Sequence, residues 1–261
     1  MNALILAAGL GTRLKPVTDY IPKALFPING KPLLQHIIEK LSISTTDGTP
    51  PSIVVNTYHH AEQIINFIQI TREAWNASIT VSDERPNLLD TGGAIKHALH
   101  KFSNSKPILI HNVDIISNVD IREFYYSSHQ HDATLLVSQR KTTRYLIFDS
   151  NMLLAGWINL KTGEIKSPYP ELQTMPLSMF DTDSYATRDK KYYLYAFSGI
   201  HIITHSLTDT FTQWQDRFSI IDFYLANCKK YKIHAYTQPD IKITDAGKIE
   251  DISSISNLNL C

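Results

Sequence analysis

The 261-residue sequence has little cysteine, no excess of charge of either sign and no long apolar run. Its two cysteines, Cys228 and Cys261, are too few for a disulfide framework. Lysine plus arginine and aspartate plus glutamate both number 25, so no overall field attracts nucleic acid or an anionic membrane. The first apolar run, residues 3–8, is too short for a signal-peptide core or a membrane span. We therefore expect a cytoplasmic protein that binds neither nucleic acid nor a membrane.

The first half of the chain alternates strand-like and helix-like segments. Short apolar runs rich in β-branched residues occupy residues 3–8, 53–55, 79–81 and 108–110. Between them, apolar residues recur at helical spacing over residues 33–41 and 61–68. This alternation predicts an α/β fold with a mostly parallel, Rossmann-like sheet and helices on both faces.

The second half is richer in strands. Extended segments are predicted over residues 133–138, 145–148, 153–160, 193–203 and 232–237. Regularity disappears between Lys166 and Lys191, where three prolines interrupt the pattern. A loop of that length inside a compact domain is usually a lid or an insertion, which we expect near residues 161–191.

A glycine-bearing turn follows the first apolar run. Gly9 and Gly11 let the backbone turn tightly, and successive free N–H groups in such a turn form an anion-binding concavity. Arg13 comes two residues later, and Lys23 follows ten residues after that arginine. A strand, a glycine loop and two cations in this order predict a polyphosphate site.

Two better-known glycine motifs do not fit this segment. The dinucleotide-binding fingerprint needs Gly or Ala where the chain has Leu14, and Pro32 stands where a phosphate-binding loop needs Ser or Thr. What remains is Gly-x-Gly-Thr-Arg-Leu, then Pro22-Lys23, then the turn at residues 30–32. This composite resembles the sugar-1-phosphate nucleotidyltransferases, also called nucleotide-sugar pyrophosphorylases. It is most similar to the small mannose- or heptose-1-phosphate guanylyltransferases and N-acetylmuramate-1-phosphate uridylyltransferases.

The resemblance implies an activity and two binding regions along the chain. It implies transfer of a nucleoside monophosphate from an NTP to a sugar 1-phosphate, with release of pyrophosphate. Among the possible nucleotides, we expect guanylyl or uridylyl transfer. We expect one domain over residues 1–261, with a nucleotide-binding half over about 1–130 and a sugar-binding half over about 131–261. NTP and sugar 1-phosphate are then the partners, and the sequence indicates no oligomeric state.

Two cations are the predicted catalytic residues. The planar fork of Arg13 suits the β- and γ-phosphates, and Pro22 stiffens the backbone that carries Lys23. In the resembled family the matching lysine neutralises the oxygens around the reacting α-phosphorus. The loop itself supplies the remaining predicted phosphate contacts, at Ala8, Gly9, Gly11, Thr12 and Arg13.

Two aspartates are the predicted metal ligands. Asp114 follows a buried strand, so its carboxylate lies at the crevice edge of the sheet and suits a hard divalent cation. Asp245 precedes a glycine turn and resembles the family's late aspartate, which completes a Mg²⁺ site with the earlier one. The family commonly has glycine and threonine where this chain has Val113 and Lys248. Asp120, by contrast, has the pattern of a helix-capping residue.

Further contacts are assigned from loops that face the same crevice. Thr91 is a natural N-cap, and the family places its Thr-Gly-Gly segment against the ribose or base. The segment Phe197-Ser198-Gly199 resembles the one that lies under the bound sugar. The predicted nucleotide contacts are Asn56, Thr91, Gly92 and Gly93, and the predicted sugar contacts are Ser198 and Gly199.

Two other functional classes stay open at this point. A non-catalytic nucleotide-sugar-binding regulator could share the fold, although all four candidate charged residues are present. A dinucleotide-dependent oxidoreductase is disfavoured by the missing third glycine. The base, the sugar and a second sugar-phosphate lysine, for which Lys166, Lys190 and Lys191 are candidates, are not assigned.

Overall fold

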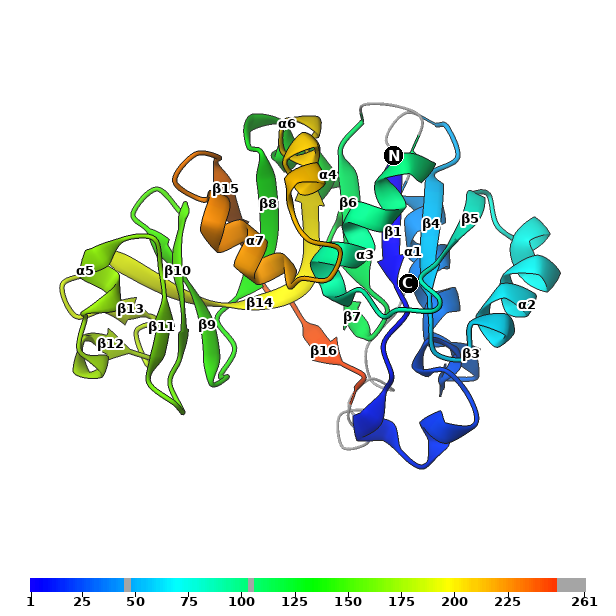
Figure 1. Ribbon diagram of the computed structural model, residues 1–261, viewed down its shortest axis with the longest axis horizontal. Helices are drawn as coiled ribbons and strands as arrows, with labels where there is room; N and C mark the ends of the chain where they lie inside the picture. The colour runs from blue at the N-terminus through cyan, green and yellow to red at the C-terminus, as the bar shows by residue number, and fades with distance from the viewer. Residues whose placement is uncertain (45–47, 103–105, 248–261) are drawn as a thin grey trace.

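The computed structural model describes residues 1–44, 48–102 and 106–247, which form an α/β fold around one large sheet (Figure 1). The helices are α1 Leu33–Ile43, α2 Ala61–Thr71, α3 Asp90–Ala98, α4 Ile121–Ser127, α5 Pro170–Gln173, α6 His205–Thr208 and α7 Ile220–Asn227. The strands are β1 Asn2–Leu6, β2 Pro27–Ile28, β3 Lys31–Pro32, β4 Ser52–Thr57, β5 Ser78–Asp83, β6 Ile108–Asn112, β7 Ile115–Ser117, β8 Ala133–Ser138, β9 Arg144–Asp149, β10 Leu154–Asn159, β11 Glu164–Lys166, β12 Phe180–Asp181, β13 Ala186–Thr187, β14 Tyr192–Ile203, β15 Ile233–Tyr236 and β16 Ile243–Asp245.

The first half of the chain builds a parallel sheet. Strands β6, β1, β4 and β5 lie side by side in that order and all pair in parallel. Their carboxyl ends therefore meet at one edge, where open α/β sheets bind ligands. The predicted mostly parallel α/β sheet is confirmed.

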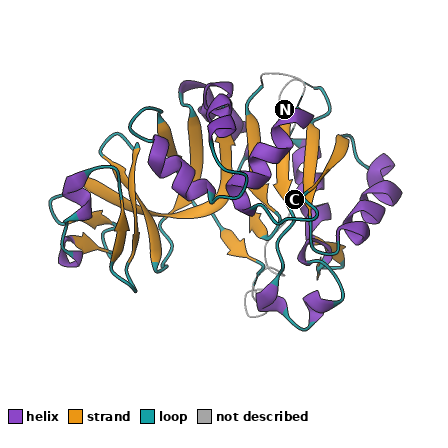
Figure 2. Cartoon of the chain, viewed as in Figure 1, coloured by secondary structure: helices purple, strands orange, loops and turns teal. Residues whose placement is uncertain are grey.

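Helices cover both faces of this sheet (Figure 2). Ala3 and Ile5 of β1 pack into one buried cluster with α1, α2 and α4, whereas Leu4 packs into a second cluster with α3 and α7. This alternation is the two-residue period of a strand, and it makes β1 apolar on both faces.

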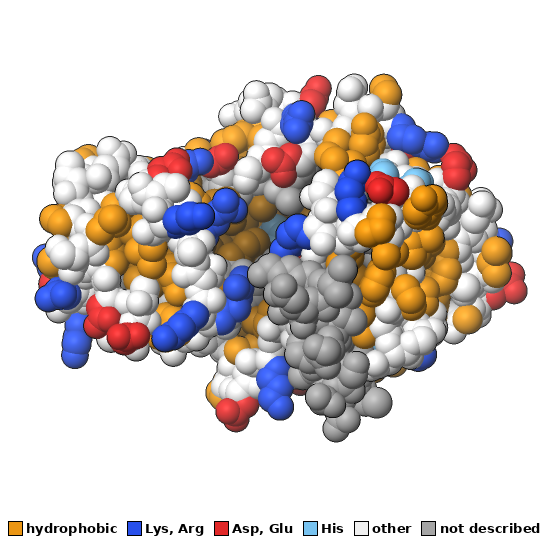
Figure 3. All heavy atoms as spheres, turned by 90° about the horizontal axis from the view of Figure 1, so that it is seen from below, with side chains coloured by type: hydrophobic (Ala, Val, Ile, Leu, Met, Phe, Trp, Pro, Cys, Tyr) orange, Lys and Arg blue, Asp and Glu red, His pale blue; other side chains and the backbone are white. Residues whose placement is uncertain are grey.

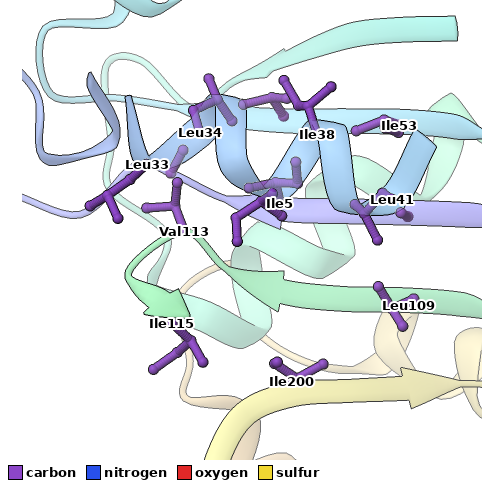
Figure 4. Close-up of a cluster of buried hydrophobic side chains, with 14 of the residues drawn as sticks. Ile5, Leu33, Leu34, Ile38, Leu41, Ile53, Leu109, Val113, Ile115 and Ile200 are labelled. Carbon is purple, nitrogen blue, oxygen red and sulfur yellow. The ribbon is translucent and has the colours of Figure 1, made fainter. Parts of the chain in front are cut away.

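Helix α1 shows how the sequence specifies one of these layers. Its residues Leu33, Leu34, Ile37, Ile38 and Leu41 are all buried, and Figure 4 shows the helix lying over β1 and β4, which carry Ile5 and Ile53. Burying each such side chain stabilises the fold by roughly 1.5–3 kcal/mol. Helices α1 and α2 have 11 residues each, whereas a membrane span needs ~20. No helix among the described residues is long and apolar enough to cross a membrane.

The long strand β14 joins the two ends of the molecule (Figure 1). Its first residues pair with β9, and its last residues pair antiparallel with β6 and with β8. Because one continuous strand belongs to both parts of the sheet, strands β9, β10 and β11 are fixed to the parallel core. The assignment of the chain to one domain with two functional halves stays a prediction.

The segment predicted to be irregular contains short regular elements. β11, α5, β12 and β13 fall between residues 164 and 187 and surround a third buried cluster, which includes Tyr145, Leu172 and Phe180. These elements have only two to four residues each, which is below the length that periodicity can detect. A lid function for residues 161–191 stays a prediction.

Helix starts were predicted with mixed success. Asp120 Oδ1 accepts hydrogen bonds from the amides of Arg122 and Glu123, at 2.9 and 3.0 Å, so the predicted cap of α4 is confirmed. Thr91 as an N-cap is wrong, because α3 begins at Asp90 and the Thr91 hydroxyl instead accepts from the amide of Ile220 at 3.0 Å.

A buried histidine makes the stability of this fold sensitive to acid. His201 on β14 bonds the hydroxyl of Tyr224 on α7, and burial lowers its pKa to about 3. The unfolded chain binds a proton near pH 6.5 whereas the folded chain does not, so stability falls as the pH drops from about 6.5 toward 3.

We predict that the double variant His201→Leu/Tyr224→Phe takes up one proton fewer than the parent when it unfolds in acid. The slope of unfolding free energy against pH, measured by urea titration between pH 4 and 6, should decrease by about 1.4 kcal/mol per pH unit. Tyr224→Phe alone should keep the parental slope. An unchanged slope in the double variant would contradict the burial of a neutral imidazole.

Candidate active site

The loop after β1 is shaped by one glycine. Gly11 has φ 64°, and a Cβ at this position would lie 2.7 Å from Cγ2 of Thr18. The Thr18 hydroxyl donates to the carbonyl of Gly11 at 2.9 Å and closes the turn. Gly11 is therefore required by both its conformation and its surroundings, whereas a Cβ at Gly9 would meet open space.

A buried polar network holds the start of the loop. Asn56 Oδ1 accepts from the amides of Ala7 and Ala8, and Asn56 Nδ2 donates to Glu84. The Glu84 carboxylate also accepts from the amide of Leu89 at 3.0 Å, and burial raises its pKa. The amide group of Asn56 is thus engaged in fixing the loop, and the amide of Ala8 is already bonded.

Two ion pairs join the loop region to the distant aspartates. Lys23 Nζ bonds Asp114 Oδ2, and only 8 % of Lys23 is exposed. Arg13 contacts Asp245 through both Nη atoms at 3.3 Å, in a half-exposed position. Each predicted phosphate-binding cation is therefore paired with one predicted metal ligand.

The two aspartates are neighbours although they are far apart in sequence. β16 pairs antiparallel with β7, which begins directly after Asp114. The amide of Ala246 donates to the carbonyl of Asp114 at 2.7 Å. This two-stranded sheet lies beside the N-terminal loop and outside the main sheet (Figure 1).

The charged groups surround a single point above Gly247. A Cβ at Gly247 would lie 2.5 Å from Arg13 Nη2, 2.6 Å from Asp245 Oδ1 and 2.7 Å from Lys23 Nζ. No side chain can occupy this point without displacing them. The glycine after the late aspartate thus leaves room for the convergence of the charged groups.

Arg13, Lys23, Asp114 and Gly247 form one wall of a cavity of about 360 Å³ at the carboxyl ends of the parallel strands, whereas Asp245 does not line it. The volume is within the range of small-molecule sites. Figure 3 shows this side of the molecule, where Lys and Arg side chains gather around a hollow. The predicted site residues that line the cavity are Ala8, Gly9, Gly11, Thr12, Arg13, Lys23, Asn56, Thr91 and Asp114.

Gly92 and Gly93 do not line the cavity. A Cβ at Gly92 would lie 2.3 Å from the Phe218 ring, and one at Gly93 would lie 2.0 Å from the carbonyl oxygen of Asp216. Both glycine amides donate to the Phe218 carbonyl. They allow residues 216–218 to approach α3, which brings Arg217 into the cavity lining. Their predicted contact with the nucleotide stays a prediction.

Ser198 and Gly199 also lie outside the cavity lining. Gly199 has φ 72°, and its Cβ would lie 2.7 Å from Nδ2 of Asn112, a residue that does line the cavity. Ser198 is buried, and its hydroxyl has no hydrogen-bond partner among the described residues. The predicted sugar contact of both residues stays a prediction.

Several residues that line the cavity were not assigned from the sequence. Glu84 directly follows β5 and Asn112 is the last residue of β6, so both lie at the edge of the sheet where the cavity lies. Arg217 has no motif nearby in the sequence. The only sequence signal for its position was the pair Gly92 and Gly93, against which residues 216–218 pack. The lining residues not assigned before are Leu6, Ala7, Glu84, Leu88, Asp90, Ala94, Asn112, Val113, Arg217 and Gly247.

The donor set fits a divalent cation that is shared with a substrate. No group of three or more His, Cys, Asp or Glu side chains suitable for a metal occurs among the described residues. Mg²⁺ is usually held by one or two carboxylates together with substrate phosphates and water, which Asp114 and Asp245 can provide. Val113 does not disturb this arrangement, since its side chain packs in the core beneath the loop (Figure 4). Lys248 lies outside the described residues.

We predict that Asn56→Ala lowers the unfolding free energy by about 2 kcal/mol or more, because two buried amides and a buried carboxylate lose a partner. Urea unfolding measures the loss. The exposed Asn76→Ala should stay within about 0.5 kcal/mol of the parent. Equal stability of the Asn56 and Asn76 variants would show that the network does not hold the loop.

Comparison with known proteins places this site in a family. The model of the nucleotidyl transferase family matches residues 2–146. N-acetylmuramate alpha-1-phosphate uridylyltransferase of Caulobacter vibrioides is 39% identical over 116 residues, which cover 44% of this chain and 46% of that protein. The D-glycero-alpha-D-manno-heptose 1-phosphate guanylyltransferase of Campylobacter jejuni is 28% identical over 251 residues, 96% of each chain.

A solved structure extends the likeness to the whole fold. HddC from Yersinia pseudotuberculosis, crystallised with GMP-PN, superposes with a TM-score of 0.70 at 23% identity and covers 98% of this chain and 97% of its own. The aligned part is less than half the length of several curated relatives, including 38% of a probable mannose-1-phosphate guanylyltransferase of Oryza sativa. The family model nevertheless spans more than half of the chain and includes the glycine loop, both cations and Asp114. The chain therefore belongs to the nucleotidyl transferase family.

Proposed function

We propose that the protein transfers a nucleoside monophosphate from an NTP to a sugar 1-phosphate and releases pyrophosphate. The observation that carries this proposal is the convergence of Arg13, Lys23 and Asp245 around Gly247, with Asp114 bonded to Lys23. Two cations and two carboxylates beside a glycine loop suit a triphosphate together with a divalent cation.

The reaction needs positioning and charge neutralisation more than covalent work by the protein. A phosphate oxygen of the acceptor attacks the α-phosphorus, a new P–O bond forms, and the bond to the departing pyrophosphate breaks with its electron pair. Lys23 neutralises oxygens at the reacting phosphorus, and Arg13 binds the leaving pyrophosphate in a bidentate way. Holding both substrates in line supplies the rest of the acceleration.

The family generally uses a divalent metal, and we propose Mg²⁺ for this chain. Asp114 and Asp245 would hold it. The ion would supply positive charge next to the phosphate oxygens. In the nucleotide complex, Lys23 and Arg13 would bind phosphate oxygens in place of their present carboxylate partners.

Guanylyl and uridylyl transfer are the proposed reactions, because the relatives named above carry these two activities in their names. The base would occupy the part of the cavity near Leu88, Asp90 and Ala94, away from the charged cluster. Residues 1–130 would bind the nucleotide and residues 131–261 the sugar. We propose a cytoplasmic location, where an NTP substrate is available.

Two substitutions test the assigned roles. Lys23→Ala and Asp114→Ala should each lower kcat for pyrophosphate release by roughly 10²–10³, since each removes a group that stabilises developing charge. Lys31→Ala removes an exposed cation that pairs with Glu39 outside the cavity and should keep parental turnover. If both site variants stay within about tenfold of the parent while folded by circular dichroism, the roles are wrong.

Metal removal provides an independent test. Treatment with EDTA should abolish pyrophosphate release, and excess Mg²⁺ should restore it. Isothermal titration of the NTP should also show weaker binding without the metal, because two carboxylates then repel the triphosphate. Full turnover in EDTA would contradict a metal held by Asp114 and Asp245.

A further inference from the structure

A second cationic cavity lies on the acceptor side of the molecule. Arg140, Arg144 and Lys166 line a space of about 360 Å³ together with Trp157 and Asp222. We call these five residues the cationic pocket. None of them lines the cavity that contains the glycine loop.

Strand register explains why these residues meet. Leu146, Trp157 and Lys166 stand opposite one another on β9, β10 and β11, and residues in register point to the same side of a sheet. Arg144 is two residues before Leu146 and shares that side. Leu146 and Trp157 pack in the cluster that contains α7, so this side of the three strands faces α7.

The charges of the cationic pocket are not balanced within the described chain. Lys166 Nζ pairs with Asp222 Oδ1 at 3.1 Å and also lies 5.5 Å from the centre of the Trp157 ring. Arg140 donates only to the carbonyl of Phe197, at 3.3 Å, and no ion pair among the described residues involves Arg140 or Arg144. Neither guanidinium group has a carboxylate partner among the described residues, so both can bind an oxyanion in the geometry that arginine favours.

The pocket lies close to the nucleotide cavity. Ser219 lines the pocket, Arg217 lines the nucleotide cavity, and Thr91 of that cavity bonds the amide of Ile220. On β14, Gly199 touches Asn112 at the nucleotide cavity, and Phe197 contacts Arg140. Phe197 and Gly199 are two residues apart in an irregular stretch of β14, so their Cα atoms are at most about 7 Å apart, which is about the width of one sugar ring.

We propose that the cationic pocket binds a second anionic group of the acceptor, either a carboxylate or a phosphate, in addition to the 1-phosphate. This inference rests on the proposed function. The 1-phosphate itself must stand beside Lys23 and Asp114 to attack the α-phosphorus, so it cannot reach the pocket beyond Phe197. The indole of Trp157 offers an apolar wall for the sugar ring between the two anionic groups. The acceptor class is therefore an acidic sugar 1-phosphate.

The test compares acceptors that differ only by an acidic group, using pyrophosphate release with GTP and UTP. The pairs are glucuronic acid 1-phosphate with glucose 1-phosphate, N-acetylmuramic acid 1-phosphate with N-acetylglucosamine 1-phosphate, and glucose 1,6-bisphosphate with glucose 1-phosphate. The parent should favour the acidic member of at least one pair by about tenfold or more in kcat/KM. The first two pairs report a carboxylate and the third a phosphate.

Substitutions in the cationic pocket then test whether its arginines cause the preference for the acidic acceptor. Arg140→Met and Arg144→Met should each remove most of the preference, without changing the KM for the NTP. Lys141→Met is the matched control, since this neighbouring lysine is 85% exposed and does not line the pocket, and it should keep the preference. All three positions are exposed enough to be replaced without unfolding the chain.

Three outcomes contradict the inference. Equal or better use of the neutral member of every pair would overturn it and leave the proposed function intact. If the arginine variants lose kcat/KM equally for the acidic and the neutral acceptor of a pair, the inference is also overturned, because the arginines would then bind the 1-phosphate that both acceptors share. Absence of pyrophosphate release with every acceptor and with both GTP and UTP would contradict the proposed function, and the inference with it.

Discussion

Two ion pairs between the N-terminal loop and the β7–β16 sheet are the constraint on which the site depends. Lys23 is buried, and a buried ammonium without a partner is costly, so Asp114 is needed even before any substrate binds. Arg13 and Asp245 form a second, more exposed pair next to it. The cluster carries two positive and two negative charges, so it is balanced in the free protein. In the proposed complex, phosphate oxygens would replace the carboxylates as partners of Lys23 and Arg13, and Asp114 and Asp245 would then be available to hold a metal.

The remainder of the fold serves to place these groups. Parallel strands bring the ends of β1, β4 and β6 to one edge, and the Asn56–Glu84 network fixes the loop that leaves β1. The glycine pair on α3 lets residues 216–218 close another wall. The strand β14 connects this edge with the strands that carry the cationic pocket. The large sheet therefore carries both the cavity beside the glycine loop and the cationic pocket, while the charged cluster lies next to it on the N-terminal loop and the β7–β16 sheet.

Local patterns predicted what depends on local structure. The period of apolar residues specified β1, α1 and α2 because burial on one or both faces leaves a direct mark on the sequence. The same holds for the Asp120 cap, since capping acts over three residues. The glycine loop and its two cations could be recognised because they are close together in the chain.

Long-range pairing could not be predicted in this way. Lys23 and Asp114 are 91 residues apart, and Arg13 and Asp245 are 232 residues apart. The strands that bring the aspartates together have three residues each, too few for a period. The roles of Gly92 and Gly93 depended on a distant segment, as did the position of Arg217, and neither had a local signal. The short elements between residues 164 and 187 were likewise below the length at which periodicity is informative.

The most direct test is a crystal structure with Mg²⁺ and a non-hydrolysable NTP analogue. Our account predicts that the metal contacts the carboxylates of Asp114 and Asp245, while Lys23 and Arg13 leave these carboxylates and bind phosphate oxygens. A complex in which both ion pairs persist and the triphosphate lies elsewhere would contradict it.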